Sequence, residues 1–161
     1  ITVSDNEACN ELVRRLGKKD AKKGMELVNQ YCENHGFTNT SMGRLMLDFN
    51  SGSENYTSVN DCGIFLKNIY NKELPGSEDI LEYMKQQQRK AKIPAGVPQG
   101  VATANKTGEL DDTENDVAFV FGPDKTYILC VMTSNLQDTS AARTLITSLS
   151  SKVYLYLQGV K

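Results

Sequence analysis

A lysine, a threonine and a glycine stand together at Lys106, Thr107 and Gly108, between the strand-like run QGVATA and a cluster of acidic residues. A lysine ammonium beside a threonine hydroxyl can bind a carboxylate through charge-assisted hydrogen bonds, and glycine lets a ligand lie beside the strand. Because side chains alternate along a strand, Lys106 and the backbone of Gly108 are predicted to share one face, with Thr107 reaching in from the rim. The alternative is a lysine that simply faces water at a strand end.

A second short motif, Ser4-Asp5-Asn6, stands just before a helical pattern. Serine, aspartate and asparagine are preferred at helix N-caps, so this triplet alone indicates only a helix start. Ser-Asp-Asn at a helix start and Lys-Thr-Gly on a strand about a hundred residues later are, however, two of the three motifs of serine β-lactamases and penicillin-binding proteins.

The sequence resembles class A β-lactamases over nearly its whole length. ITVSDNEACNELV is similar to the segment around their second motif, GVATANKTGEL to the strand with the third, and DVAFVFGPDKTYILCVMTSN to the following hairpin. The resemblance implies a serine hydrolase without a cofactor, located in the bacterial envelope or exterior. It would act on β-lactams or on the D-Ala-D-Ala end of a peptidoglycan stem peptide, through an acyl-enzyme.

The resemblance also implies a role for each matching residue. Ser4 would relay a proton, and Asn6 would bond the amide of the acyl side chain. Lys106, the second catalytic residue, and Thr107 would hold the substrate carboxylate. The main-chain N–H of Glu109 would contribute to the oxyanion hole, whatever its side chain.

The third motif of the family, Ser-x-x-Lys, which supplies the nucleophile, does not occur in the sequence. The nearest approaches pair Ser41 with Arg44 and Ser140 with Arg143, and a guanidinium cannot be deprotonated to act as a base. We therefore expect the nucleophile to lie in an N-terminal segment outside this chain, which would complete the protein. The isolated chain is predicted to have no hydrolase activity.

A second departure concerns the loop at residues 38–55, where class A β-lactamases carry the glutamate that activates the deacylating water. The aligned place lies near Phe49 and Asn50, while the nearby acids Asp48 and Glu54 do not fit the pattern. Two alternatives follow. Without that base, the protein is either a penicillin-binding-type acylating protein or a peptidase that releases its acyl group slowly. A separate hypothesis for the whole protein is a non-catalytic relative that binds peptidoglycan or β-lactams. A Ser-x-x-Lys upstream would favour the enzyme.

Composition adds limits to these interpretations. The chain has 161 residues, 39% of them hydrophobic and 24% charged, enough for one domain with a real core. Its 18 basic and 20 acidic side chains give no electrostatic reason to expect nucleic acid as a partner. No apolar run is long enough to span a bilayer. Four scattered cysteines and the single His35 predict no metal site.

The motifs must be positioned by an α+β fold of the β-lactamase type. Periodicity predicts helices at 8–16, 25–32, 58–70 and 77–90, and strands at 100–110, 116–121 and 126–133, the last two joined as a hairpin by GPDK. A helix at 138–158 is predicted to cover the sheet with Ala141, Leu145, Leu149, Val153 and Tyr156.

The predicted organisation is a helical region, 1–95, with the Ser-Asp-Asn motif, and a sheet with its terminal helix, 96–161, with the Lys-Thr-Gly motif. The two regions are expected to form one intimate domain from which an N-terminal part is absent. The chain alone should then present an unpaired sheet edge and apolar helix faces.

Overall fold

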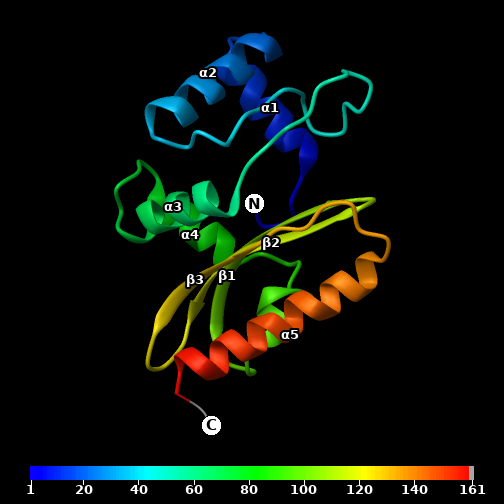
Figure 1. Cartoon of the computed structure of the whole chain (residues 1–161). Coiled ribbons are helices and arrows are strands. Elements are labelled where there is room, and N and C mark those ends of the chain that lie inside the picture. Colours follow the sequence, from blue (N-terminus) through cyan, green and yellow to red (C-terminus); the bar gives the residue numbers. More distant parts are fainter. Residues whose placement is uncertain (160–161) are drawn as a thin grey trace. The chain divides into compact units, whose positions relative to one another are not determined.

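The computed structural model describes residues 1–159 and has the predicted α+β composition (Figure 1). Five α-helices, one short 3-10 helix and three strands make up the described part of the chain. In chain order they are α1 Asn6–Leu16, α2 Ala21–Asn34, α3 Val59–Tyr70, α4 Ser77–Lys85, η1 Ile93–Gly96, β1 Ala102–Leu110, β2 Thr113–Phe121, β3 Thr126–Val131 and α5 Thr139–Leu157.

The contacts divide the chain into two compact units. Ile1–Ser4 joins Phe65–Lys161 in the first unit, and Asp5–Ile64 forms the second. The division therefore falls inside α3, whereas the composition changes near residues 95–96. The single intimate domain expected from the sequence stays a prediction.

The sheet of the first unit is antiparallel with the strand order β1-β2-β3. Lys106 lies opposite Val117 in the first ladder, and Phe121 lies opposite Thr126 in the second. The strand β2 begins at Thr113, three residues before the predicted start. The sequence pattern missed this beginning because Glu114, which looks like an exposed turn residue, is buried in the strand.

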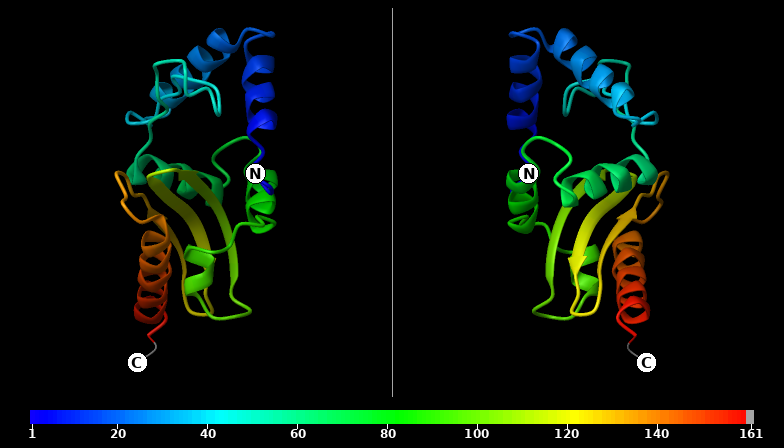
Figure 2. Two further views of the ribbon diagram at one scale, coloured as in Figure 1. Left: turned by 90° about the vertical axis from the view of Figure 1, so that its right-hand side faces the viewer. Right: turned by 90° about the vertical axis from the view of Figure 1, so that its left-hand side faces the viewer.

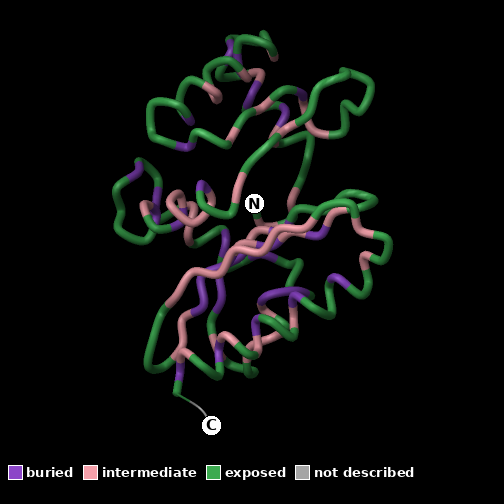
Figure 3. The backbone as a smooth tube through the Cα atoms, in the orientation of Figure 1, coloured by how far each residue is buried: buried purple, intermediate pink, exposed green. Residues whose placement is uncertain are grey.

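Each face of the sheet has its own apolar core. On one face Ala104 and Phe119 pack with the end of α3, with Leu74 and with Met84 of α4. On the other face Ala118 and Val120 pack with η1 and α5, which lies along the sheet (Figure 2). Buried residues of this unit accordingly lie along β1, β2 and one side of α5, whereas β3 is mostly of intermediate exposure (Figure 3).

The terminal helix covers the sheet with a different face from the predicted one. Leu145 and Tyr156 are 69% and 84% exposed, whereas the buried positions are Ala142, Ile146, Ser150 and Tyr154. Ser150 lies on the buried face because its hydroxyl donates to the Ile93 carbonyl at 2.8 Å. A Cβ on Gly96 would lie 2.3 Å from a carbonyl of α5, so η1 packs directly on the helix backbone.

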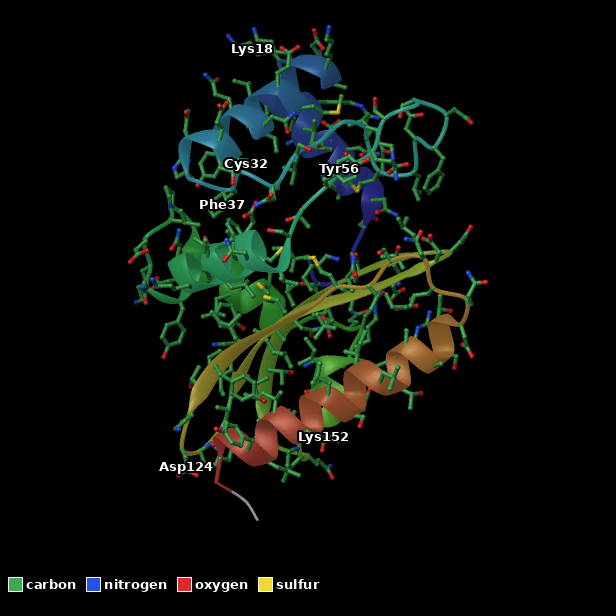
Figure 4. All side chains as sticks on the ribbon, in the orientation of Figure 1. Lys18, Cys32, Phe37, Tyr56, Asp124 and Lys152 are labelled. Atoms are coloured by element: carbon green, nitrogen blue, oxygen red, sulfur yellow. The ribbon has the colours of Figure 1, made fainter. Side chains whose placement is uncertain are left out.

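The far end of α5 is tied to the turn between β2 and β3. The side-chain oxygen of Gln158 accepts hydrogen bonds from the N–H groups of Asp124 and Lys125 at 2.9 and 3.1 Å. Figure 4 labels Asp124 in this turn and Lys152 on α5. The hairpin predicted from GPDK is thus held by the helix as well as by its own ladder.

The second unit is built around α1 and α2. Asp5 and Asp20 cap these helices by accepting the N–H groups of Ala8 and Lys23. Gly24 allows a close crossing, because a Cβ there would lie 2.0 Å from the Val13 carbonyl oxygen. Asparagine side chains of both helices bind the backbone of the loop that follows.

We expect the isolated chain to associate through the exposed side of α5. Leu145 and Leu149 lie one turn apart and are 69% and 44% exposed. Replacing both with aspartate should shift the sedimentation profile toward monomer while leaving the thermal midpoint nearly unchanged. The matched control Ile146→Asp, at a site 3% exposed, should unfold the chain. A strictly monomeric wild-type chain with a sharp melt would contradict the expectation.

Candidate functional site

The N-terminal residues are held against the segment that follows α4. The Gln87 side chain, 1% exposed, donates to the Ile1 carbonyl at 2.7 Å, and the Gln88 N–H donates to the Thr2 carbonyl at 3.0 Å. These bonds accompany the end of α4 at Lys85, earlier than the predicted end near residue 90. They bring Ser4 to the strand β1 within a single compact unit.

Ser4 and Lys106, 102 positions apart in the sequence, are joined by a hydrogen bond. The ammonium of Lys106 donates to the Ser4 hydroxyl at 2.7 Å and also to the carbonyl of Thr107. Ser4 has a φ of 57°, in the left-handed region that non-glycine residues rarely adopt. Such strain persists only where the surroundings determine it, and it is concentrated at functional sites.

The strand β1 separates the members of the Lys-Thr-Gly motif. Lys106 and Gly108 share one face, as alternation predicts, and Gly108 is exposed. A Cβ on Gly108 would lie 3.6 Å from its nearest neighbour, so packing within the unit does not require glycine here. Thr107 lies on the other face, 6% exposed and opposite Asp116, instead of at an open rim.

The surroundings of Lys106 have opposing effects on its pKa. Burial lowers the pKa of Lys106 below its usual value, and repulsion from Arg89 and Lys92 lowers it further. The carboxylates of Asp116 and Glu109 act against these effects. Lys106 is therefore a partly buried cation whose proton is held less firmly than that of a surface lysine.

A buried polar cluster lies on the opposite face of β1 and was missed by the sequence analysis. Asp116 is fully buried, and it accepts hydrogen bonds from the Ile93 N–H at 3.0 Å and the Asn105 side chain at 3.1 Å. Burial raises the pKa of Asp116 to about 6. Glu114, 1% exposed, is paired with Lys92 and Arg143. Alternating acids inside an otherwise apolar strand pattern were the available signal.

Glu109 contributes its side chain to the same cluster. Its carboxylate lies 2.9 Å from Arg89 and 3.1 Å from Lys92. Its backbone role in an oxyanion hole stays a prediction. Asn6 is the first residue of α1, is exposed, and belongs to the other compact unit, so its role as a substrate-binding residue also stays a prediction.

Within that second unit, the face of α1 that carries Asn6 also carries Asn10, one turn further on. Asn10 is buried, and its amide both accepts from the Met46 N–H at 2.7 Å and donates to the Met46 carbonyl at 3.2 Å. Asn29 of α2 holds Met42 in the same two-bond manner, at 2.6 and 3.0 Å. The loop residue fixed beside the Asn6 face is therefore Met46, which precedes Phe49 and Asn50, the place expected from the sequence.

Asp48 and Glu54, the two acids near the expected position of the family's glutamate, do not lie beside Asn10. Glu54 lies 2.9 Å from Arg44, which closes the loop, and the Arg44 guanidinium lies 4.7 Å from the ring centre of Phe49. Asp48 is exposed. Neither acid occupies the position that Asn10 fixes.

Comparison with known proteins identifies the family. A sequence profile described as the beta-lactamase enzyme family matches residues 1–157, and the chain belongs to this family. No curated protein matches the chain. Solved structures, in contrast, match it over almost its whole length.

Two of these structures are of PBP-A. The first has 28% identity and a TM-score of 0.84, and covers 99% of this chain and 58% of that chain. The second, with 28% identity and a TM-score of 0.86, is a single-residue mutant of PBP-A as an acyl-enzyme complex with penicillin-G, and covers 99% and 59%. A β-lactamase from Sphaerobacter thermophilus has 25% identity and a TM-score of 0.81, covering 100% and 61%. The chain thus has the β-lactamase fold and spans about three fifths of these relatives.

Two further observations concern residues 1–159. They contain no cluster of three or more histidine, cysteine, aspartate or glutamate side chains able to hold a metal ion. None of their helices combines the length and the apolar character needed to cross a bilayer.

The raised pKa of Asp116 predicts a pH-dependent stability. The native state holds a proton up to about pH 6, whereas an unfolded aspartate loses it near 3.8, so this contribution is present below 3.8 and is lost as the pH rises through 6. Two pKa units correspond to on the order of 3 kcal/mol. The free energy of unfolding of the wild type, relative to Asp116→Asn, should fall by this order between pH 4 and 7 in urea melts. Parallel profiles for the two proteins would contradict this.

Proposed function

We propose that the protein is a serine hydrolase of the class A β-lactamase type, which reacts with β-lactams or D-Ala-D-Ala peptides through an acyl-enzyme. Because the chain spans about three fifths of its structural relatives, this activity is proposed for the protein that also contains the nucleophile. The proposed location is the bacterial envelope or exterior, on the family resemblance alone.

The hydrogen bond between Ser4 and Lys106 is the observation that carries the proposal. It joins the hydroxyl of one family motif to the ammonium of the other, and it holds a serine in a strained backbone conformation. A penicillin acyl-enzyme of a relative with 28% identity supports β-lactams as the substrate class.

The chemistry follows from the properties of these groups. A substrate carboxylate would gain about 1.5 to 3 kcal/mol from each charge-assisted hydrogen bond to Lys106 or its neighbours. The Ser4 hydroxyl, which already accepts a hydrogen bond from Lys106, would pass a proton to the leaving nitrogen. The main-chain N–H of Glu109 would stabilise the oxyanion.

Release of the acyl group is the step for which the loop offers no evident base. Met46 occupies the position that Asn10 fixes beside the Asn6 face of α1, and methionine cannot activate water. This observation favours, within the proposed class, an enzyme of the penicillin-binding type that stays acylated for long periods over a fast β-lactamase.

Substitution of Lys106 tests the carboxylate site. In the full-length protein, Lys106→Ala should slow acylation by a penicillin about tenfold to a hundredfold, because one charge-assisted bond is lost. The control Lys125→Ala removes an equal charge from the exposed turn between β2 and β3 and should have little effect. Acylation is followed by intact mass. Equal effects of the two substitutions would mean that Lys106 is only a solvated lysine at a strand end and does not bind the substrate carboxylate.

Substitution of Met46 tests the missing base. Met46→Glu should shorten the lifetime of the penicillin acyl-enzyme by at least about tenfold, since a placed general base contributes about 10²–10⁴. Met46→Gln has nearly the same shape without the base and should keep the wild-type lifetime. Mass spectra taken during decay of the acyl-enzyme provide the measurement. An equal gain from glutamine would exclude general-base action at this position.

A further inference from the structure

Lys92 occupies an unusual place directly behind the β1–β2 hairpin. Its side chain is 2% exposed, and its ammonium contacts Glu114 at 2.7 Å, Glu109 at 3.1 Å and the Asn115 carbonyl at 2.9 Å. The contact with Asn115 is a hydrogen bond, and the two carboxylates are ion-pair partners of the ammonium. A lysine is rarely buried this completely, so its partners must compensate for the lost water.

The two glutamates that it contacts face each other across the ladder. Glu109 is the register partner of Glu114, and both side chains lie on the same face of the sheet. Two carboxylates in this arrangement repel one another. Among the ion pairs of residues 1–159, Lys92 is the cation that contacts both, while Arg89 pairs with the first and Arg143 with the second.

The direction of the Glu109 backbone follows from the bonds of its partner. The Glu114 N–H donates to the Thr133 hydroxyl at 2.8 Å, and this hydroxyl donates back to the Glu114 carbonyl at 2.8 Å. The polar backbone groups of Glu114 therefore point away from β1, which makes Glu109 and Glu114 a non-hydrogen-bonded pair. The N–H of Glu109 consequently points toward the outer edge of β1.

In a non-hydrogen-bonded pair the side chains are closer together than in a hydrogen-bonded pair. The repulsion between Glu109 and Glu114 is then greatest at the place where no ladder bonds join the two residues. The contact of Lys92 with both carboxylates offsets this repulsion from behind the strand.

We propose that Lys92 is a positioning residue that fixes the main-chain N–H of Glu109 at the edge of β1 by holding the Glu109 side chain. The inference rests on the proposed function, in which that N–H stabilises the oxyanion. The Glu109 side chain then affects catalysis through its ion pair with Lys92, although only the Glu109 backbone N–H contacts the oxyanion.

The first test uses the full-length protein and a penicillin. Lys92→Met should slow acylation about tenfold or more with little change in the concentration for half-saturation, because misplaced catalytic groups reduce the rate of the chemical step. The ester carbonyl of the acyl-enzyme should absorb at higher infrared frequency, since its hydrogen bond is weaker. Lys92→Arg should restore most of both values. The control Lys72→Met, which removes an exposed lysine paired with Glu78, should change neither.

A second variant guards against general loss of structure. Glu109→Ala removes the same ion pair while leaving Lys92 paired with Glu114, and should reproduce the slower acylation and the shifted carbonyl band. The double variant should be no slower than the slower single variant, because both remove one contact. A wild-type carbonyl frequency in Lys92→Met, or additive effects, would overturn the proposal.

Failure of the proposed function would give a different result. If neither a penicillin nor a D-Ala-D-Ala peptide acylates the wild-type protein, the proposed hydrolase is excluded, yet the effect of Lys92 can still be measured by the NMR order parameter of the Glu109 amide. That order parameter should fall in Lys92→Met and stay at the wild-type value in Lys72→Met. An unchanged order parameter in Lys92→Met would overturn the positioning role itself.

Discussion

The burial of two carboxylates in one strand imposes a constraint on much of the first compact unit. Glu114 and Asp116 are at most 1% exposed, and a buried charge is tolerated only with partners. Glu114 draws Lys92 and Arg143 to β2 from different parts of the chain, and Asp116 binds the start of η1. The polar row thereby fixes the strand that carries Lys106 from the side opposite to Ser4.

Different interactions consequently hold the two faces of β1. Behind the strand, ion pairs and hydrogen bonds surround the buried side chains of Lys92, Glu114 and Asp116, while Arg89 and Arg143 at the ends of the network are about half exposed. In front of it, the Ser4–Lys106 bond depends on an N-terminal segment held by Gln87 and by the backbone of Gln88. The front is built from hydrogen bonds to a short N-terminal segment, one of them donated by the Lys106 ammonium, and the back from a network of opposite charges.

Sequence alone predicted much of the fold, because helical periodicity, turn residues and the two motifs are local signals. It also predicted that Lys106 and Gly108 share a face, which follows from strand alternation. The prediction failed where polar side chains are buried. The start of β2 was missed because Glu114 resembles a turn residue, and the buried face of α5 was misplaced because Ser150 packs inward. The partners of Glu114 and Ser150 are distant in the sequence, so the local pattern of residue types could not predict their burial.

The asparagine clamps in the second unit have an evolutionary consequence. Asn10 and Asn29 contact the backbone N–H and carbonyl groups of Met46 and Met42. Because Asn10 and Asn29 bond only to backbone groups of the loop, these hydrogen bonds do not depend on which side chain the loop residue carries. The loop can therefore exchange an inert side chain for a reactive one in a single substitution without a new way of holding itself in place. The chemical character of the side chain at position 46 is in this sense independent of how the loop is held in place.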